Sequence, residues 1–126
     1  MIKVLLIDDE EDFCELVKAN LEETGEFEVI TTTDPQEGLN LAKRELPHVI
    51  LLDIVMPGMD GSTLAGKLRE DPLTANIPVI FLTAIVTQSE IGSEGREISG
   101  RHFFAKPVET PALIRYIKKV LKIGGE

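Results

Sequence analysis

The chain has 126 residues, of which 43% are hydrophobic and 28% are charged, and its formal net charge is −9. This length suits one core, so we expect residues 1–126 to form a single domain. No apolar stretch approaches the roughly 20 residues of a membrane helix, and the negative charge would repel a phosphate backbone. We therefore expect a cytoplasmic protein that binds neither membranes nor nucleic acid directly.

Patterns typical of strands and of helices alternate along the chain, with no linker between them. Short apolar runs predict strands at residues 3–7, 27–32, 49–52, 78–82 and 103–104. Helical spacing predicts helices between residue 13 and Gly25, from Pro35 to before Pro47, from a cap at Ser62 to Asp71, and from about Pro111 to a close at Gly124. Residues 86–100 contain three glycines and few apolar residues, so we expect only a short, mobile helix there.

This alternation of strands and helices favours an α/β fold with a parallel sheet. Right-handed crossovers place helices on both faces of such a sheet. We expect a doubly wound three-layer sandwich, with a five-stranded parallel sheet and five helices.

Polar side chains follow four of the predicted strands, at the point where each strand ends. Asp8 and Asp9 follow the first strand, Asp53 the third, Thr83 the fourth and Lys106 the fifth. Because the carboxyl ends of parallel strands open onto one edge of the sheet, we expect these side chains to converge.

Three carboxylates at one edge of the sheet would repel one another. Like charges that are packed together take up a proton or attract a cation, and a site with few oxygen ligands suits Mg²⁺. Favourable interaction with a helix N-terminus is enough to explain the acids at residues 10–12, but not Asp8 and Asp9, which come directly after a buried strand. Thr83 and Lys106 are ordinary residues when taken singly, so only the combination is specific.

In this order and spacing the chain resembles the receiver domains of two-component response regulators, of the single-domain chemotaxis-regulator type, over essentially its whole length. The resemblance rests on Asp8–Asp9, the LLDIVMPGMDG stretch around Asp53, Thr83–Ala84 and Lys106–Pro107. It implies a flavodoxin-like fold and a phosphorylation-activated signalling switch. Such a protein is not a conventional enzyme, although it catalyses its own aspartyl phosphorylation and dephosphorylation.

The resemblance also implies roles for individual residues. Asp53 would accept a phosphoryl group, and Thr83 and Lys106 would contact the phosphoryl oxygens. Mg²⁺ or Mn²⁺ would be held directly by Asp9 and Asp53, largely through water by Asp8, and by the backbone carbonyl of Val55. No organic cofactor is implied.

Further positions bear on switching and signal lifetime. Thr83 and Phe103 correspond to the switch residues of the family, and Pro107 to its cis-proline. Phe103 also fits a plain core residue. Val55 and Ile85 occupy positions that influence hydrolysis of the acyl phosphate, and because neither can hydrogen-bond a water, we expect slow self-dephosphorylation.

The implied phosphodonor is a sensor histidine kinase or a histidine phosphotransfer protein. A downstream protein or effector domain would bind the predicted fourth helix, fifth strand and fifth helix. The sequence does not decide whether the protein forms a homodimer on phosphorylation, or whether the chain stands alone or belongs to a larger regulator.

Two other classes of protein share parts of this sequence pattern. A small aspartyl-phosphate phosphatase would need a second acid two residues after its nucleophile, and a flavin-binding electron carrier would need a phosphate-binding loop where this chain has five acids.

Overall fold

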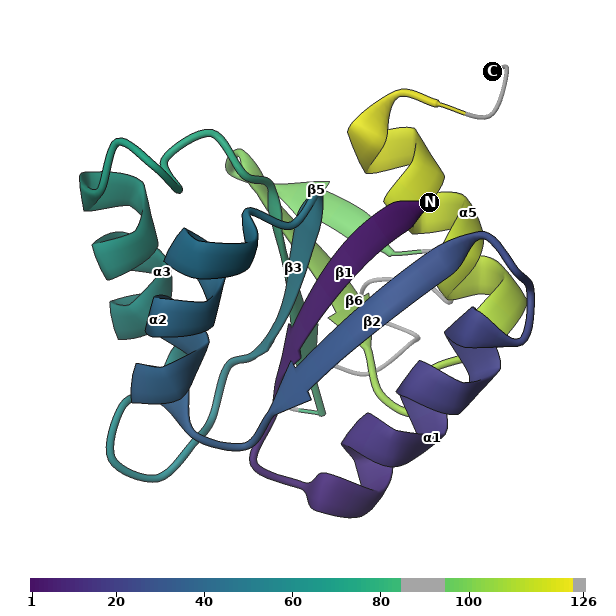
Figure 1. The fold of residues 1–126 in the computed structure, drawn as a ribbon, viewed down its shortest axis with the longest axis horizontal. Coiled ribbons are helices and arrows are strands. Elements are labelled where there is room, and N and C mark those ends of the chain that lie inside the picture. The colour runs from purple at the N-terminus through teal and green to yellow at the C-terminus, as the bar shows by residue number, and fades with distance from the viewer. Residues whose placement is uncertain (85–94, 124–126) are drawn as a thin grey trace.

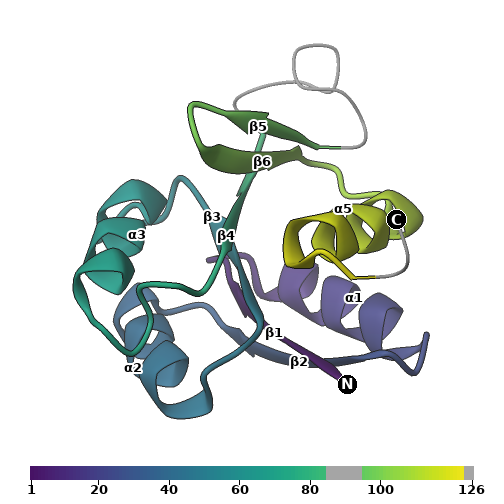
Figure 2. The same cartoon turned by 90° about the horizontal axis from the view of Figure 1, so that it is seen from above.

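The computed structural model describes residues 1–84 and 95–123, in which a central sheet lies between two pairs of helices (Figure 1). The strands are β1 (Ile2–Ile7), β2 (Phe27–Thr32), β3 (Val49–Asp53), β4 (Val79–Thr83), β5 (Arg96–Ile98) and β6 (Arg101–Ala105). The helices are α1 (Glu11–Glu22), α2 (Pro35–Glu45), α3 (Gly61–Glu70) and α5 (Thr110–Leu121). Figure 2 shows α1 and α5 on one face of the sheet and α2 and α3 on the other. Within the described ranges, no helix has the length and apolar character needed to cross a membrane.

The strands follow the order β2-β1-β3-β4-β6-β5, and every neighbouring pair is parallel except β5 and β6. The chain therefore winds outward from β1 in both directions, and the winding reverses between β1 and β3. This arrangement confirms the predicted doubly wound α/β sandwich. In such sheets ligands bind outside the carboxyl ends of the strands beside the reversal.

The prediction of a purely parallel five-stranded sheet is wrong at its edge, where β5 and β6 form an antiparallel hairpin. Ser99 and Gly100 connect the two strands, and both have positive φ, 53° and 80°. Two such residues in a row suit a two-residue hairpin turn. The helix expected over residues 86–100 is therefore wrong at β5, and the rest of it, in residues 86–94, lies outside the described residues. The described part of the chain has four helices rather than the expected five.

The helix starts follow local hydrogen-bonding rules. Asp34 caps α2, because its Oδ1 accepts a hydrogen bond from the Gln36 amide at 3.0 Å. The cap of α3 is Asp60 and not Ser62, since Asp60 Oδ1 accepts from the Thr63 amide at 2.8 Å. At the other end of the chain, α5 ends at Leu121, and the next residue, Lys122, caps it with φ 60°. The predicted close at Gly124 lies outside the described residues.

Two apolar cores fill the space on either side of the sheet. In β1, Val4 and Leu6 face the core under α1 and α5, while Leu5 and Ile7 face the core under α2 and α3. β3 alternates in the same way, and its five residues are all buried. Burial on both faces explains why these strands read as continuous apolar runs.

Candidate functional site

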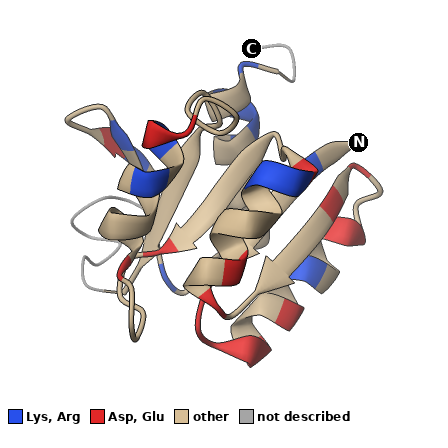
Figure 3. Ribbon diagram, turned by 60° about the vertical axis from the view of Figure 1, so that its left-hand side comes forward, with Lys and Arg blue, Asp and Glu red and all other residues tan. Residues whose placement is uncertain are grey.

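The sheet order brings the strand-end residues of four neighbouring strands to one edge. Asp8 follows β1, Asp53 ends β3, Thr83 ends β4 and Lys106 follows β6. Acidic segments of the ribbon gather at this edge and in the loop that leads into α1 (Figure 3). The predicted convergence of polar groups is therefore present in the fold.

The three aspartates lie close together. One carboxylate oxygen from each of Asp8, Asp9 and Asp53 lies within 4.8 Å of the other two. Asp8 is fully buried and Asp53 is only 6% exposed, whereas Asp9 is exposed at the mouth of the site. Burial, and next the charge of Asp8, raise the pKa of Asp53 to about 6, and the charge of Lys106 and a hydrogen bond from the Val55 amide act in the opposite direction.

Lys106 is the cation of this cluster. Its Nζ lies 2.8 Å from Asp8 Oδ2, 3.2 Å from Glu10 Oε1 and 3.8 Å from Asp53 Oδ1. Burial acts to lower the pKa of Lys106, but hydrogen bonding to Asp8 and the surrounding carboxylates outweigh it, so the pKa is raised. The ammonium therefore stays charged beside the acids.

Two further residues position this ammonium, and the sequence did not indicate either. Glu10 pairs with Lys106, although its sequence position suggested only a helix N-terminus. The Phe13 ring lies below the same ammonium, with its centroid 4.5 Å from Nζ, a cation–π arrangement. Both contacts depend on how the first turn of α1 is placed against the loop after β6.

The donor set fits a hard divalent cation. Asp8 Oδ1 accepts a hydrogen bond from the Glu10 amide at 2.9 Å. Asp8 Oδ2 is buried and pairs with Lys106 at 2.8 Å, and no other group among the described residues donates a hydrogen bond to it. A buried carboxylate oxygen with unused capacity, beside two more carboxylates, is a suitable ligand for Mg²⁺.

A close backbone approach fixes the loop between β3 and α3. The Gly61 amide donates to the Ile54 carbonyl at 2.7 Å, and the Ile54 amide donates to the Leu82 carbonyl at 3.3 Å. A Cβ at Gly61 would overlap with the Asp53 carbonyl oxygen and lie 2.9 Å from Ile54 Cα. Glycine is therefore required here for the chain to pass directly against Asp53.

The remaining predicted residues lie around this cluster. Thr83 is buried at the end of β4, and its carbonyl accepts a hydrogen bond from the Lys106 amide at 3.0 Å. The Lys106–Pro107 peptide bond is cis. Phe103 is half-buried and stacks on Phe81 with ring centroids 5.5 Å apart. Val55 is 59% exposed.

Comparison with known proteins agrees with this geometry. The family model described as the response regulator receiver domain matches residues 4–118. The chain belongs to this family. As a receiver domain it is a phosphorylation-activated signalling switch of two-component systems, and such domains interact with kinases or phosphotransfer partners.

Individual relatives and solved structures support the assignment of this chain to the receiver family. The chain is 37% identical to the response regulator PleD of Caulobacter vibrioides over 95% of its own length and 26% of that protein. It is 33% identical to the DNA-binding dual master transcriptional regulator RpaA of a Synechocystis strain, over 97% of its length and 50% of that protein. The chain thus spans half or less of these relatives.

Among solved structures, a putative response regulator from Chloroflexus aurantiacus matches with a TM-score of 0.79 and 31% identity, over 96% of this chain and 98% of that one. The Vibrio cholerae chemotaxis protein CheY4 matches with a TM-score of 0.80 and 26% identity, over 95% and 98%. These likenesses confirm the flavodoxin-like fold of this receiver.

Proposed function

We propose that Asp53 is the residue of this receiver that accepts the phosphoryl group. The observation that carries this assignment is the position of its carboxylate. It is buried at the end of β3, with oxygens of Asp8 and Asp9 within 4.8 Å and Lys106 Nζ 3.8 Å away. In this reaction a carboxylate oxygen of Asp53 attacks the phosphorus of a phosphohistidine. The phosphorus–nitrogen bond breaks, its electron pair stays with the imidazole, and an acyl phosphate forms on Asp53.

Asp8, Asp9 and Asp53 would hold Mg²⁺ or Mn²⁺, with the backbone carbonyl of Val55 as a further ligand. When bound, the ion supplies charge neutralisation for the aspartates and for the incoming phosphoryl oxygens. Lys106 supplies a second, fixed positive charge beside Asp53, and Thr83 offers a hydroxyl at the end of the neighbouring strand β4. Together these groups position and neutralise the phosphoryl group, which is most of what phosphoryl transfer requires.

The same site would catalyse its own phosphorylation from a small phosphodonor and its own dephosphorylation by water. Val55 is exposed at the mouth of the site and has no group that can hydrogen-bond an attacking water. This supports a slow loss of the phosphoryl group. Ile85, which is expected to act in the same way, lies outside the described residues.

A hollow beside the cluster suits a phosphodonor protein. It has a volume of about 340 Å³, and its lining includes Phe13 and Leu16 of α1, Lys106, Pro107 and Val108. Leu16 is 60% exposed, so this apolar side chain is available for contact with a partner. An apolar helix of a sensor kinase or phosphotransfer protein that docks here would bring its phosphohistidine next to the Lys106 edge of the site. Binding of such a kinase or phosphotransfer protein would be consistent with the cytoplasmic location that we expect from the sequence, which stays a prediction.

Phosphorylation would be read by a downstream protein or effector domain on the face formed by β6 and α5. A homodimer would form through the same face. Thr83 and Phe103 would report the event. Thr83 would move toward the phosphate and Phe103 would turn inward behind it. Adding a beryllofluoride phosphate mimic should change the NMR signals of the Phe103 ring, and an unchanged ring environment would mean that Phe103 is only a core residue.

Incubation with acetyl phosphate, read by intact mass, tests the acceptor and its metal dependence together. The expected result is one phosphoryl adduct with Mg²⁺, little or none with a chelator, and none for Asp53→Asn. Asp60→Asn is a matched control, because Asp60 is an exposed helix cap outside the cluster. An adduct that persists in Asp53→Asn, or that forms equally without Mg²⁺, would contradict the assignment.

A further inference from the structure

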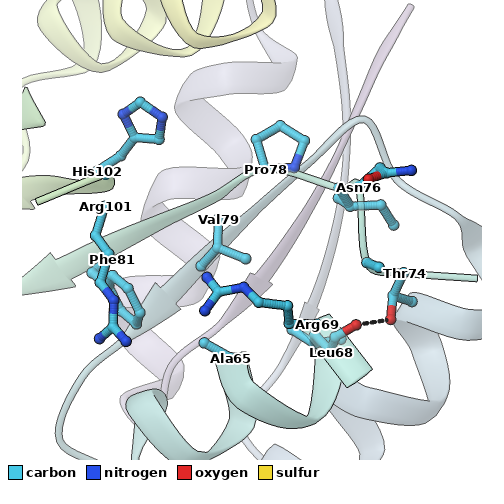
Figure 4. Close-up of a pocket in the computed structure, with 13 residues that line it drawn as sticks. Ala65, Leu68, Arg69, Thr74, Asn76, Pro78, Val79, Phe81, Arg101 and His102 are labelled. Atoms are coloured by element: carbon cyan, nitrogen blue, oxygen red, sulfur yellow. Dashed lines mark hydrogen bonds between the residues drawn. The ribbon is translucent and has the colours of Figure 1, made fainter. Parts of the chain in front are cut away.

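A second pocket lies at the opposite end of β4 and β6 from Thr83 and Lys106. It has a volume of about 320 Å³ and lies between these strands and the C-terminal part of α3 (Figure 4). Its lining includes the buried side chains Ala65 and Phe81. The volume is at the lower end of the range of about 300 to 1,000 Å³ that is typical of small-molecule sites.

The charge of this pocket is opposite to that of the protein. The chain has 22 acidic and 13 basic residues, yet the pocket lining contains Arg69 and Arg101 and no acidic residue. In the described part of the chain, neither guanidinium forms an ion pair or a hydrogen bond. The nearby acid Asp71 pairs instead with Lys43, at 3.3 Å. Two like charges in one small pocket repel each other, and an anion would offset that repulsion.

The two arginines come from different elements and reach the same part of the pocket. In Figure 4 the Arg69 side chain extends from α3 toward Phe81, and Arg101 reaches the same region from the start of β6. A favourable interaction with the C-terminal end of the α3 dipole is enough to explain an arginine at position 69, but it does not explain Arg101, which lies on β6. The His102 ring points away from both and contacts Tyr116 Oη, 3.0 Å from Nδ1.

We propose that this pocket binds a small organic anion. Arg69 and Arg101 would hold its phosphate or carboxylate, because the planar guanidinium fork matches both groups. Its apolar part would lie against Phe81 and Ala65. The site shares no residue with the aspartate cluster, so this proposal does not rest on the assignment of Asp53 as phosphoryl acceptor.

Phenyl phosphate is a suitable probe, since it combines a dianion with one ring. The isotope-labelled full chain, carrying Asp53→Asn and without Mg²⁺ so that the aspartate cluster does not respond, is titrated at constant ionic strength and followed by NMR. We expect saturable shifts of the Arg69 and Arg101 side-chain signals and of the Phe81 amide. Arg69→Gln or Arg101→Gln should each weaken binding by about tenfold, because each removes a charge-assisted hydrogen bond.

Matched variants and probes make the outcome decisive. Arg44→Gln removes an exposed arginine elsewhere and should leave binding unchanged. Benzoate should also bind, whereas benzyl alcohol should not, and inorganic phosphate should bind more weakly than phenyl phosphate because it lacks the apolar part. Non-saturating shifts, or equal binding in the Gln variants, would overturn the proposal. So would binding of an acidic peptide but not of phenyl phosphate or benzoate, since the pocket would then recognise a protein segment.

Discussion

The two halves of the sheet differ in how firmly their residues are held. β1 and β3, which carry Asp8 and Asp53, are covered by helices on both faces, and residues 4–7 and 49–52 are fully buried. β6 begins with an exposed residue, and its edge partner β5 is exposed at all three positions. Phe103 lies on β6 and Lys106 directly after it, while Thr83, which is buried, ends the neighbouring strand β4.

This difference matches the division of work expected of a switch. Asp53 and Asp8 are buried at the ends of strands that have little room to shift, because interiors are close-packed and resist deformation. The other two proposed metal ligands, Asp9 and Val55, are exposed in the loops that follow. Phe103, which is expected to respond, lies on β6, whose edge partner β5 is exposed, so a local rearrangement there disturbs fewer contacts. A rigid reacting site and a more adjustable readout can therefore share one sheet.

The largest expected effect comes from the rigid half. Gly61→Ala should destabilise the protein by about 3 kcal/mol and abolish phosphorylation, because its Cβ would overlap with the backbone at Asp53. Gly66→Ala is the matched control. A Cβ at Gly66 meets nothing within 4 Å, so this helix substitution should stabilise the protein by about 0.5 to 1 kcal/mol. Urea unfolding and acetyl phosphate labelling measure both effects, and a tolerated Gly61→Ala would show that the loop is not rigid.

A smaller effect is expected from the hairpin half. Gly95 has φ 85°, and a Cβ there would lie 2.9 Å from ring atoms of Phe104 and Tyr116. Gly95→Ala should cost about 2 kcal/mol, from backbone strain and overpacking together. Gly100 has φ 80° and open space around it, so Gly100→Ala isolates the strain alone, about 1 kcal/mol. Both variants should still be phosphorylated, and loss of labelling in either would mean that the two halves are not separable.

The metal-free site should be destabilised by its own charge. The pKa of Asp53 is raised from about 3.8 to about 6 in the folded protein, so stability falls as the pH rises between these values and the full penalty is present above about pH 6. Asp53→Asn should therefore stabilise the metal-free protein near pH 7.5, by about 1 to 2 kcal/mol after allowance for screening by water. The gain should shrink near pH 5, where folded Asp53 takes up its proton, and Mg²⁺ should stabilise only the parent protein.

Asp60→Asn serves as the control, because ionisation of Asp60 has the opposite effect on the free energy of unfolding. The pKa of Asp60 is lowered by a hydrogen bond from the Thr63 amide, so its ionised form favours folding above its ordinary pKa. This substitution should not stabilise the protein at any of these pH values. Unfolding of both variants and the parent, followed by circular dichroism, makes the comparison. Equal stability of Asp53→Asn and the parent at pH 7.5 would mean that the ionised Asp53 carboxylate does not destabilise the folded, metal-free protein.

The smallest effect concerns the lifetime of the acyl phosphate. Val55→Asn places an amide at the exposed mouth of the site, where it can orient an attacking water, and should speed hydrolysis by a few-fold. The measurement is loss of the phosphoryl adduct over time in intact mass spectra. Leu73→Asn, at an equally exposed position outside the site, should leave the rate unchanged. An unchanged rate in Val55→Asn would show that this position does not set the lifetime.

The strand-end residues could be predicted because parallel strands share one polarity. Once the apolar runs were assigned to strands, Asp8, Asp53, Thr83 and Lys106 had to fall at the same edge. The β5–β6 hairpin could not be predicted in the same way. Glycine lowers helix propensity without choosing among a loop, a turn and a distorted helix, and the Ser99–Gly100 turn was the only local signal.

Contacts that depend on side-chain placement were also beyond the sequence. Glu10 and Phe13 surround Lys106 because the first turn of α1 lies against the loop after β6, 96 residues further on for Glu10. The cap of α3 moved from Ser62 to Asp60 because the helix begins where Gly61 passes against Asp53. Both depend on packing between distant elements.

The central claim is that Asp53, and not a neighbouring acid, carries the phosphoryl group. Borohydride reduces an acyl phosphate and leaves homoserine where the aspartate stood, so reduction after labelling with acetyl phosphate and Mg²⁺ marks the acceptor for peptide mass spectrometry. Homoserine at position 53 alone is the predicted result. Homoserine at position 8 or 9, or no homoserine despite a phosphoryl adduct in the intact mass, would contradict it.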